Sequence, residues 1–487
     1  MLPYKTLITI DRTIAVPLYI QICNSFIYLI KEGILKPCDA LPSTRKLADI
    51  ITINRNTANL AYEELISQGW AESVDRKGIF INELLPVPKK VQGEIIKAKE
   101  NESGFIWTNK FANALPAPNL QKYTLAIDEG FPDVRLAPID YLMAEYRSIS
   151  KRFYGKSFLK YGSPKGCDHL RNAVGKYLSV TRGLSSATEN ILITKGSQMA
   201  IYLAAQLLLE PGDNVAVGNS SYHAADAAFK LCKANLLRIP VDENGMDIDY
   251  LEQALQNTII KAVYVIPHHH CPTTVTMSME HRQKLLRLAK EYSFAIIEDD
   301  YDFEFHYEDL VYLPLASMDH NHNVIYIGSF SKTLAPAIRT GFLIGPAEFI
   351  NAAAALRKLT DRQGDSLFEE ALASLLNNGE IERHFRKTIK IYKERRNIFC
   401  NILTTEFNDS ITFETPAGGL AVWSVFDKSI DIVKVSEQAS KKGLYISNGS
   451  YYKNESFNTN SLRMGFASLE VSEMTQAFEI LKKSITS

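Results

Sequence analysis

The pattern of hydrophobic and polar positions along the chain changes after about residue 83. The first segment with helical spacing places four apolar residues on one face: Leu18, Ile22, Phe26 and Ile30. Pro17 precedes this segment and Gly33 follows it, as is typical of the first and last positions of a helix. The pattern predicts an amphipathic helix near the start of the chain.

Two shorter helices and a hairpin are predicted next. Ser43 can cap a short helix, and Asn54 can cap a second one. Residues 71–74 and 79–81 have the composition of two strands around a turn. Three helices followed by a hairpin are the order of a winged helix-turn-helix, so residues 1–83 are predicted to form a DNA-binding domain of this kind.

A different pattern marks the rest of the chain. Residues 84–124 contain prolines and charge clusters without periodicity, which predicts a linker whose Phe105, Ile106 and Trp107 dock on a neighbouring surface. From residue 125 to 487, short apolar strands alternate with amphipathic helices. The predicted strands are residues 190–194, 214–217, 262–266, 294–297 and 323–327. This alternation predicts βαβ units in a mainly parallel, doubly wound sheet.

Composition excludes several classes of protein. Of the 487 residues, 46% are hydrophobic and 22% are charged, which is typical of globular chains rather than disordered or fibrous ones. The net charge of −1 gives no overall field for nucleic acid or an anionic membrane, so such a partner would need a local patch. Six scattered cysteines and the lack of a long apolar run predict a soluble cytoplasmic protein with reduced thiols and no membrane partner.

Ligands of open α/β sheets bind beyond the carboxyl ends of the strands, so the residues that follow each strand are candidates. Lys195-Gly196-Ser197-Gln198 leads into a helix, where free N–H groups favour a phosphate, although its glycine could serve the turn alone. Glu298-Asp299-Asp300-Tyr301 is an acidic cluster that suits a cation, a helix N-terminus or a metal. Gly328-Ser329-Phe330-Ser331-Lys332 follows a third strand, with Arg339 shortly after.

Pyridoxal 5′-phosphate suits all three strand ends. Its aldehyde needs a lysine, its ring nitrogen needs a carboxylate, and its phosphate needs hydroxyls, a helix start and a cation. Lys332 and Asp299 can supply the first two groups. The phosphate would be held by Gly196, Ser197, Ser329, Ser331 and Arg339.

These strand ends and two N-terminal motifs carry a resemblance to a known family. The stretches are Tyr161-Gly-Ser-Pro-Lys-Gly166, Ile297–Asp302, Gly328–Arg339, Leu41-Pro-Ser-Thr-Arg45 and Asn54-Arg-Asn-Thr57. The chain resembles the MocR/GabR subfamily of GntR-type transcriptional regulators, in which a winged helix-turn-helix precedes a fold-type I aminotransferase-like domain. The resemblance implies a large parallel-sheet domain, a smaller C-terminal α+β subdomain and pyridoxal 5′-phosphate as cofactor.

The resemblance also implies roles for individual residues. The catalytic pair would be Lys332, which forms the imine, and Asp299 at the ring nitrogen. Tyr301 would lie near the ring hydroxyl and Tyr222 would stack on the ring. Arg463 would grip the α-carboxylate of an amino acid effector, unless it forms a surface salt bridge. The other expected cofactor contacts are Gly196, Ser197, Gln198, Ser329, Ser331, Arg339 and, across to a partner subunit, Tyr161.

The chain departs from its relatives at two places. His268-His269-His270-Cys271-Pro272-Thr273-Thr274 stands where aminotransferases of this fold commonly have Asn-Pro-x-Asn-Pro-Thr-Gly, and the missing asparagine argues against efficient transamination. Asp226 stands where relatives often have arginine, which predicts that a second acidic group on the effector is disfavoured. Adjacent histidines in an extended segment point to opposite faces, and no second ligand group has useful spacing, so no metal site is expected.

DNA contacts are expected at the start of the second and third predicted helices and at the wing. The expected residues are Arg45, Arg55, Asn56, Thr57, Lys77 and Gly78. Arg55 could instead pair with Glu63 or Glu64, and the whole unit could be a small packing module.

Two functions remain open from the sequence. A transcriptional regulator would bind a double-stranded DNA operator and sense either the cofactor or an amino acid or amine. An active aminotransferase would carry the DNA-binding module as an appendage, and both functions need Lys332. The complete winged-helix pattern and the missing asparagine favour the regulator. Two DNA half-sites need two DNA-binding units, and fold-type I sites are characteristically completed by a second subunit, so a homodimer is expected.

Overall fold

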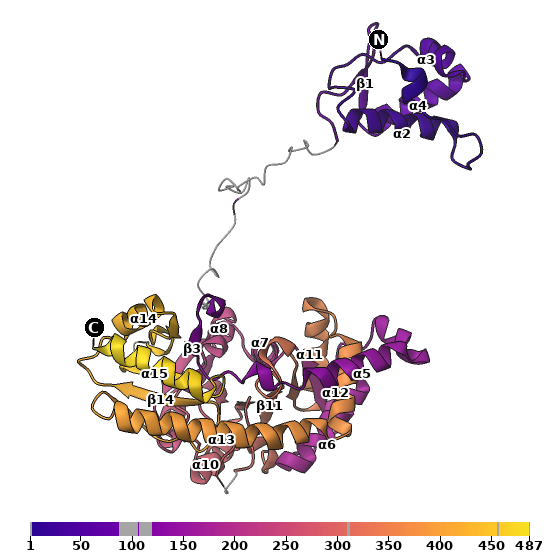
Figure 1. Ribbon diagram of the computed structural model, residues 1–487. Coiled ribbons are helices and arrows are strands. Elements are labelled where there is room, and N and C mark those ends of the chain that lie inside the picture. The colour runs from indigo at the N-terminus through magenta and orange to yellow at the C-terminus, as the bar shows by residue number, and fades with distance from the viewer. Residues whose placement is uncertain (1, 87–105, 107–118, 309–311, 455–456, 487) are drawn as a thin grey trace. The chain divides into compact units, whose positions relative to one another are not determined.

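The computed structural model describes residues 2–86, 106, 119–308, 312–454 and 457–486. The chain divides into two compact units, Met1–Trp107 and Thr108–Ser487 (Figure 1). Most of the predicted linker, with Phe105 and Trp107, lies outside the described residues, and Ile106 is exposed. The linker boundaries at 84 and 124 therefore stay predictions.

The N-terminal unit has the predicted helix order and hairpin. Its elements are α1 (Tyr4–Leu7), α2 (Leu18–Lys31), α3 (Thr44–Ile51), α4 (Arg55–Ser67), β1 (Ala71–Val74) and β2 (Gly78–Ile81). The Ser43 hydroxyl accepts from the Lys46 N–H and the Asn54 side chain accepts from the Asn56 N–H, so both predicted caps are present. The core residue Phe26 is fully buried against the other helices. The short α1 was not expected from the sequence.

The larger unit is built on a seven-stranded sheet with the order β4-β12-β11-β10-β9-β5-β6. The strands are β4 (Ile191–Thr194), β5 (Asn214–Gly218), β6 (Asn235–Ile239), β9 (Ile260–Val265), β10 (Ala295–Asp300), β11 (Val324–Ser329) and β12 (Gly341–Ile344). The pairing is mainly parallel, as expected, except at β12, which pairs antiparallel with both neighbours. The connection from β11 to β12 contains only a 3-10 turn, too little chain for the crossover helix that a parallel pair requires.

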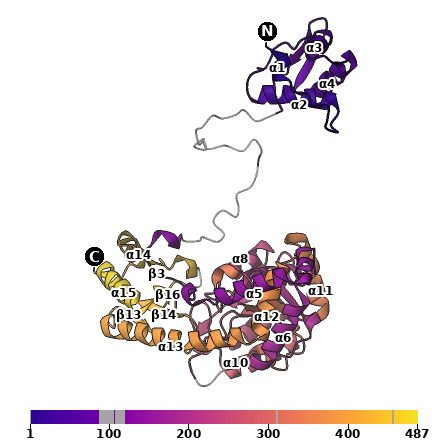
Figure 2. The same ribbon diagram turned by 45° about the vertical axis from the view of Figure 1, so that its right-hand side comes forward.

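Helices cover both faces of this sheet (Figure 2). Ile297 of β10 packs into the core with α7, α8 and α11, whereas the preceding Ile296 packs with α9 and α10. Successive strand residues point to opposite faces, so each strand serves two cores, and the doubly wound arrangement is confirmed. The helices of this domain are α5 (Ile139–Lys151), α6 (Asp168–Arg182), α7 (Ser197–Leu208), α8 (His223–Leu231), α9 (Ile248–Leu255), α10 (Met279–Tyr292), α11 (Ala347–Thr360) and α12 (Ser366–Asn377). Between β6 and α9 lies a small hairpin of β7 (Val241–Asp242) and β8 (Gly245–Met246).

A smaller α+β subdomain follows the long helix α13 (Glu380–Glu406), as the resemblance implied. Its antiparallel sheet is β13 (Ile411–Phe413), β14 (Ala421–Phe426) and β16 (Ser461–Gly465), with helices α14 (Ile432–Lys441) and α15 (Val471–Ile485). A second sheet pairs β15 (Leu444–Ile446) with β3 (Leu125–Ile127) in parallel. Through β3, the start of the larger unit contributes to its C-terminal subdomain. In the described part of the chain, no helix is long and apolar enough to cross a membrane.

Candidate functional site

A cavity of about 430 Å³ lies at the carboxyl ends of the central strands, between the large sheet and the C-terminal subdomain. Ten of the residues expected from the sequence line it: Ser197, Gln198, Tyr222, Asp299, Tyr301, Ser329, Ser331, Lys332, Arg339 and Arg463. Gly196 lies directly behind this set as the N-cap of α7. The structure therefore brings together side chains from positions up to 266 residues apart in the sequence.

Lys332 is buried in this cavity just beyond β11. Its Nζ donates a hydrogen bond to the Gly130 carbonyl over 2.7 Å and lies 4.1 Å from the ring centroid of Phe131. Burial lowers the pKa of Lys332 to about 8, although the nearby Asp128 carboxylate acts in the opposite direction. A larger fraction of this amine is thus neutral near physiological pH than for an exposed lysine, and the neutral amine is the nucleophile.

Asp299 is the penultimate residue of β10, the strand next to β11, after which Lys332 follows. Its Oδ2 accepts a hydrogen bond of 2.8 Å from the Tyr264 hydroxyl, while its buried Oδ1 has no hydrogen-bond partner among the described residues. Burial raises the pKa of Asp299 to about 7, and the neighbouring Asp300 and Asp302 add to this rise. A buried carboxylate with a free oxygen is suited to a cationic ring N–H.

A cradle for an anion lies where α7 begins. Gly196 has a φ of +80°, and a Cβ there would lie 3.1 Å from the Arg339 guanidinium, so this close approach requires glycine. Arg339 donates to the carbonyl of Lys195 over 3.2 Å, which keeps its side chain at the turn. The buried Ser331 hydroxyl has no partner in the described part of the chain. Free N–H groups of a first helical turn, a hydroxyl and a guanidinium fit a phosphate.

Arg463 lies on β16 and reaches the same cavity. Its side chain is 3% exposed, which excludes the surface salt bridge considered from the sequence. Its Nε donates to the Glu129 carbonyl, its Nη1 to the Pro272 carbonyl and its Nη2 to the Tyr301 hydroxyl, at 3.0, 3.0 and 3.1 Å. Tyr301 in turn donates to the His269 carbonyl over 2.8 Å. The guanidinium is held at a fixed orientation and has further N–H groups for a carboxylate.

The segment with three histidines forms part of the cavity wall through Cys271. Cys271 stands where the resemblance places the missing asparagine, and burial raises the pKa of its thiol to about 11. The histidine rings are held by protein atoms: His268 by the Tyr312 carbonyl, His269 by Asp302 and His270 by Thr273. Among the described residues, no group of His, Cys, Asp or Glu has the arrangement of a metal site.

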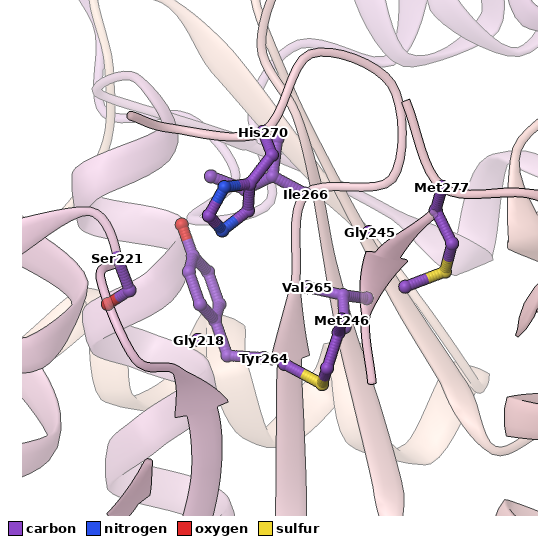
Figure 3. Close-up of a pocket in the computed structure, with 9 residues that line it drawn as sticks. All are labelled: Gly218, Ser221, Gly245, Met246, Tyr264, Val265, Ile266, His270 and Met277. Carbon is purple, nitrogen blue, oxygen red and sulfur yellow. The ribbon is translucent and has the colours of Figure 1, made fainter. Parts of the chain in front are cut away.

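A second, much smaller cavity of about 10 Å³ lies behind Tyr264, the partner of Asp299. Figure 3 shows the rings of Tyr264 and His270 on its wall, together with Met246 and Met277. Burial lowers the pKa of His270 to about 3, so this ring is neutral. The space suits about one water molecule and is too small for a metabolite.

Two other sequence expectations have different outcomes. Tyr161 is 77% exposed, does not line the cavity of its own chain, and lies under the guanidinium of Arg362. Its expected reach to a partner's cofactor stays a prediction. Asp226 does not line the cavity either, because it pairs with Arg238 and accepts a hydrogen bond from Ser221.

In the N-terminal unit, the residues expected to contact DNA lie on the surface. Arg45, Arg55, Asn56, Lys77 and Gly78 are exposed, and Thr57 is partly buried. No ion pair joins Arg55 to Glu63 or Glu64 in the described structure, so its guanidinium is available. Arg12, which sequence analysis missed, donates to the Thr52 carbonyl over 3.2 Å, beside the turn between α3 and α4.

Sequence analysis also missed three residues that lie in or beside the cavity. Tyr264 orients Asp299, the Gly130 carbonyl holds Lys332, and Glu129 lines the cavity. Their roles depend on contacts between distant segments, and no local motif marks them. Tyr264 lies on a predicted strand, but its place beside the strand of Asp299 is visible only in the structure.

The sheet, the cavity at its strand ends and the buried lysine and aspartate define the fold-type I class of pyridoxal phosphate proteins, joined here to a winged helix-turn-helix. Residues 132–481 match the aminotransferases of class I and II, and residues 18–81 match the bacterial regulatory proteins of the gntR family. The chain belongs to the class I and II aminotransferase family and carries a GntR-type region ahead of that domain. This order confirms the resemblance to MocR-type regulators and indicates pyridoxal 5′-phosphate as the cofactor.

The chain is similar to relatives of two kinds, regulatory proteins and aminotransferases. The probable rhizopine catabolism regulatory protein MocR of Rhizobium meliloti is 24% identical, and the match covers 98% of this chain and 96% of MocR. The aromatic-amino-acid aminotransferase 1 of Thermococcus litoralis is 28% identical over 74% of this chain and 88% of its own length. The crystal structure of Pyrococcus horikoshii kynurenine aminotransferase is 28% identical, with a TM-score of 0.72 over 78% of this chain and 97% of that one.

Proposed function

We propose that this protein is a DNA-binding transcriptional regulator whose aminotransferase-like unit binds pyridoxal 5′-phosphate and responds to the cofactor or to an amino compound. The observation that carries the proposal is the presence of two sites in one chain: the exposed basic residues Arg45, Arg55 and Lys77 of the N-terminal unit and a cofactor cavity with its lysine and aspartate. The regulatory protein MocR, which spans nearly the whole chain, has a name that agrees with this function.

The cavity residues fit the cofactor group by group. The free Oδ1 of Asp299 would accept the ring N–H, the unpartnered Ser331 hydroxyl and Arg339 would hold the phosphate, and Lys332 would hold the aldehyde carbon. Tyr222, which lines the cavity, would cover one face of the ring. When bound, the cofactor supplies an aldehyde that bonds to primary amines. Arg463 would orient the carboxylate of an incoming amino acid.

An active aminotransferase is the second candidate function. It is favoured by Lys332, whose lowered pKa suits proton transfer as well as covalent bonding. Against it stands Cys271, whose buried thiol cannot make the hydrogen bonds of an asparagine amide at that position. We therefore place regulation first and slow turnover second.

A cytoplasmic homodimer is part of the proposal. The exposed Tyr161 supports it, because this aromatic side chain lies on the surface, where a neighbouring subunit can contact it. Dimers also place two DNA-binding units for two half-sites.

The proposal is tested by titrating the full-length protein against the DNA upstream of its own gene, with unrelated DNA as competitor. A regulator binds this DNA at least about 10³-fold more tightly than unrelated DNA. Equal affinity for both DNAs, together with steady transamination of an amino acid and a keto acid, would establish the aminotransferase instead.

A further inference from the structure

The charges of the cavity leave one carboxylate without a counterpart. In the proposed function, Asp299 faces the cofactor ring, while Lys332 and Arg339 serve its aldehyde and phosphate. Asp128 is fully used within the fold, because it accepts hydrogen bonds from Gly130, Phe131 and Ser468. Among the described residues that line the cavity, this leaves only the carboxylate of Glu129 without an assigned cation.

Glu129 is held firmly beside both of the groups that would grip an amino acid. Its own carbonyl accepts the hydrogen bond from Arg463 Nε at 3.0 Å, and the next carbonyl, that of Gly130, accepts from Lys332 Nζ at 2.7 Å. The side chain of Glu129 therefore starts between the carboxylate-binding arginine and the amine-binding lysine. Its Oε1 is buried and has no hydrogen-bond partner in the described structure.

The surroundings of Glu129 favour a cation rather than a second acid. Tyr445, Tyr451 and Tyr452 line the same side of the cavity. Burial raises the pKa of Tyr445 and of Tyr451, and the charge of Glu129 raises both further, which shows that its field reaches these hydroxyls. His223 stacks on Tyr451 with ring centroids 5.6 Å apart and fixes that aromatic face. Tyr452 also hydrogen-bonds to the Glu129 side chain, so the carboxylate lies among tyrosine side chains. A carboxylate and neighbouring aromatic rings both favour an ammonium group.

We propose that the effector of this site is an amino acid with a second cationic group on its side chain, recognised by Glu129. The inference rests on the proposed function and names the chemical class of its effector. The effector's carboxylate pairs with Arg463, its α-amine faces Lys332, and its distal ammonium pairs with Glu129. The expected rejection of a second acidic group thus has its source in Glu129, since Asp226 is already paired with Arg238.

The test compares pairs of amino acids that differ in the distal charge. Ornithine and lysine are titrated into the cofactor-loaded full-length protein by calorimetry, beside the uncharged norvaline and norleucine and the acidic glutamate. We expect ornithine or lysine to bind about tenfold or more tightly than its uncharged counterpart, because a hydrogen bond to a buried charge is lost in the latter. Glutamate should bind most weakly.

Glu129→Gln should remove this preference while the protein keeps its cofactor content and its affinity for DNA, which shows that the variant folds. Glu210→Gln, at an exposed acid away from the cavity, is the matched control and should retain the preference. Equal binding of charged and uncharged amino acids by the wild type, or an unchanged preference in Glu129→Gln, would overturn the inference. A protein that binds DNA and cofactor but none of these amino acids would also overturn the inference, whereas the proposed function would still stand. Loss of DNA binding altogether would instead count against the function itself.

Discussion

At the residue scale, the site depends on charges that the fold has buried. Asp299 lies near the end of β10 and Lys332 follows the neighbouring β11. Burial shifts the pKa of each side chain in the direction that favours its neutral form. These shifts are expected where a charge lacks a nearby counterpart. A cofactor with a cationic ring and an aldehyde supplies what each of the two side chains lacks, so both should matter for holding it.

The first prediction concerns Lys332. Replacing it with alanine should abolish the yellow colour of the protein and the adduct that borohydride makes permanent, because no other lysine among the described residues lines the cavity. Lys195→Ala is the control: its ammonium is exposed and pairs with Asp361, so colour and adduct should remain. Absorbance spectra and peptide mass spectrometry measure both. A reducible adduct in Lys332→Ala would refute the assignment.

The second prediction concerns Asp299 and pH in the cofactor-free protein. The pKa of Asp299 is about 7 in the folded chain against an ordinary value of 3.8, so between these values the folded state binds more protons than the unfolded state. Its contribution to the free energy of unfolding therefore falls as pH rises from about 4 to 7. Calorimetry of Asp299→Asn should show a weaker decline in the melting temperature of the larger unit over this range.

If the melting temperature fell equally with pH in the wild type and in Asp299→Asn, the carboxylate of Asp299 would not be held in the neutral form. The same variant should also retain the cofactor less well, since an amide cannot neutralise a cationic ring.

The sequence was informative about residues in short motifs and uninformative about residues that act through distant contacts. Lys332, Asp299 and Arg339 follow strands that the apolar pattern identifies, so their convergence could be predicted. Glu129 and Tyr264 could not be assigned roles, because the first depends on packing against Arg463 across the subdomain boundary. The second depends on strand order within the sheet.

At the scale of elements, capping residues and apolar periodicity located three helices and the hairpin of the N-terminal unit and five strands of the large sheet. Ser43 and Asn54 begin α3 and α4 as predicted, because each side chain satisfies a free N–H of the first turn. β6 and β12 were missed, and with β12 its antiparallel pairing in the otherwise parallel sheet. β12 has only four residues, too few for a periodic signal that distinguishes a strand from a turn.

The third prediction separates the recognition helix from the wing. Arg55 begins α4, the helix expected in the major groove, so Arg55→Ala should weaken operator binding by about 1–3 kcal/mol and affect unrelated DNA less. Lys77 lies in the exposed turn between β1 and β2, so Lys77→Ala should weaken binding to both DNAs and reduce the salt dependence. Fluorescence anisotropy at several salt concentrations measures these effects. Equal losses on both DNAs for the two variants would remove the distinction.

At the scale of the whole molecule, the order of the two units could be predicted from the sequence, since each carries its own motifs. The coupling between ligand binding in the larger unit and DNA binding could not be predicted from the sequence. This coupling is a difference in free energy between states of the protein and not a contact that a motif can mark. A ligand in the cavity shifts the DNA-binding equilibrium only by its differential affinity for those states. Such couplings are typically about 1–3 kcal/mol.

The most direct test of the account is an operator titration of three forms of the full-length protein: cofactor-free, cofactor-loaded, and loaded with ornithine or lysine present. We predict that operator affinity changes by about 5–150-fold between at least two of these forms. Lys332→Ala should lose the response while it still binds DNA. Identical affinities and identical DNA footprints for all three wild-type forms would contradict the account and favour an aminotransferase with an attached DNA-binding unit.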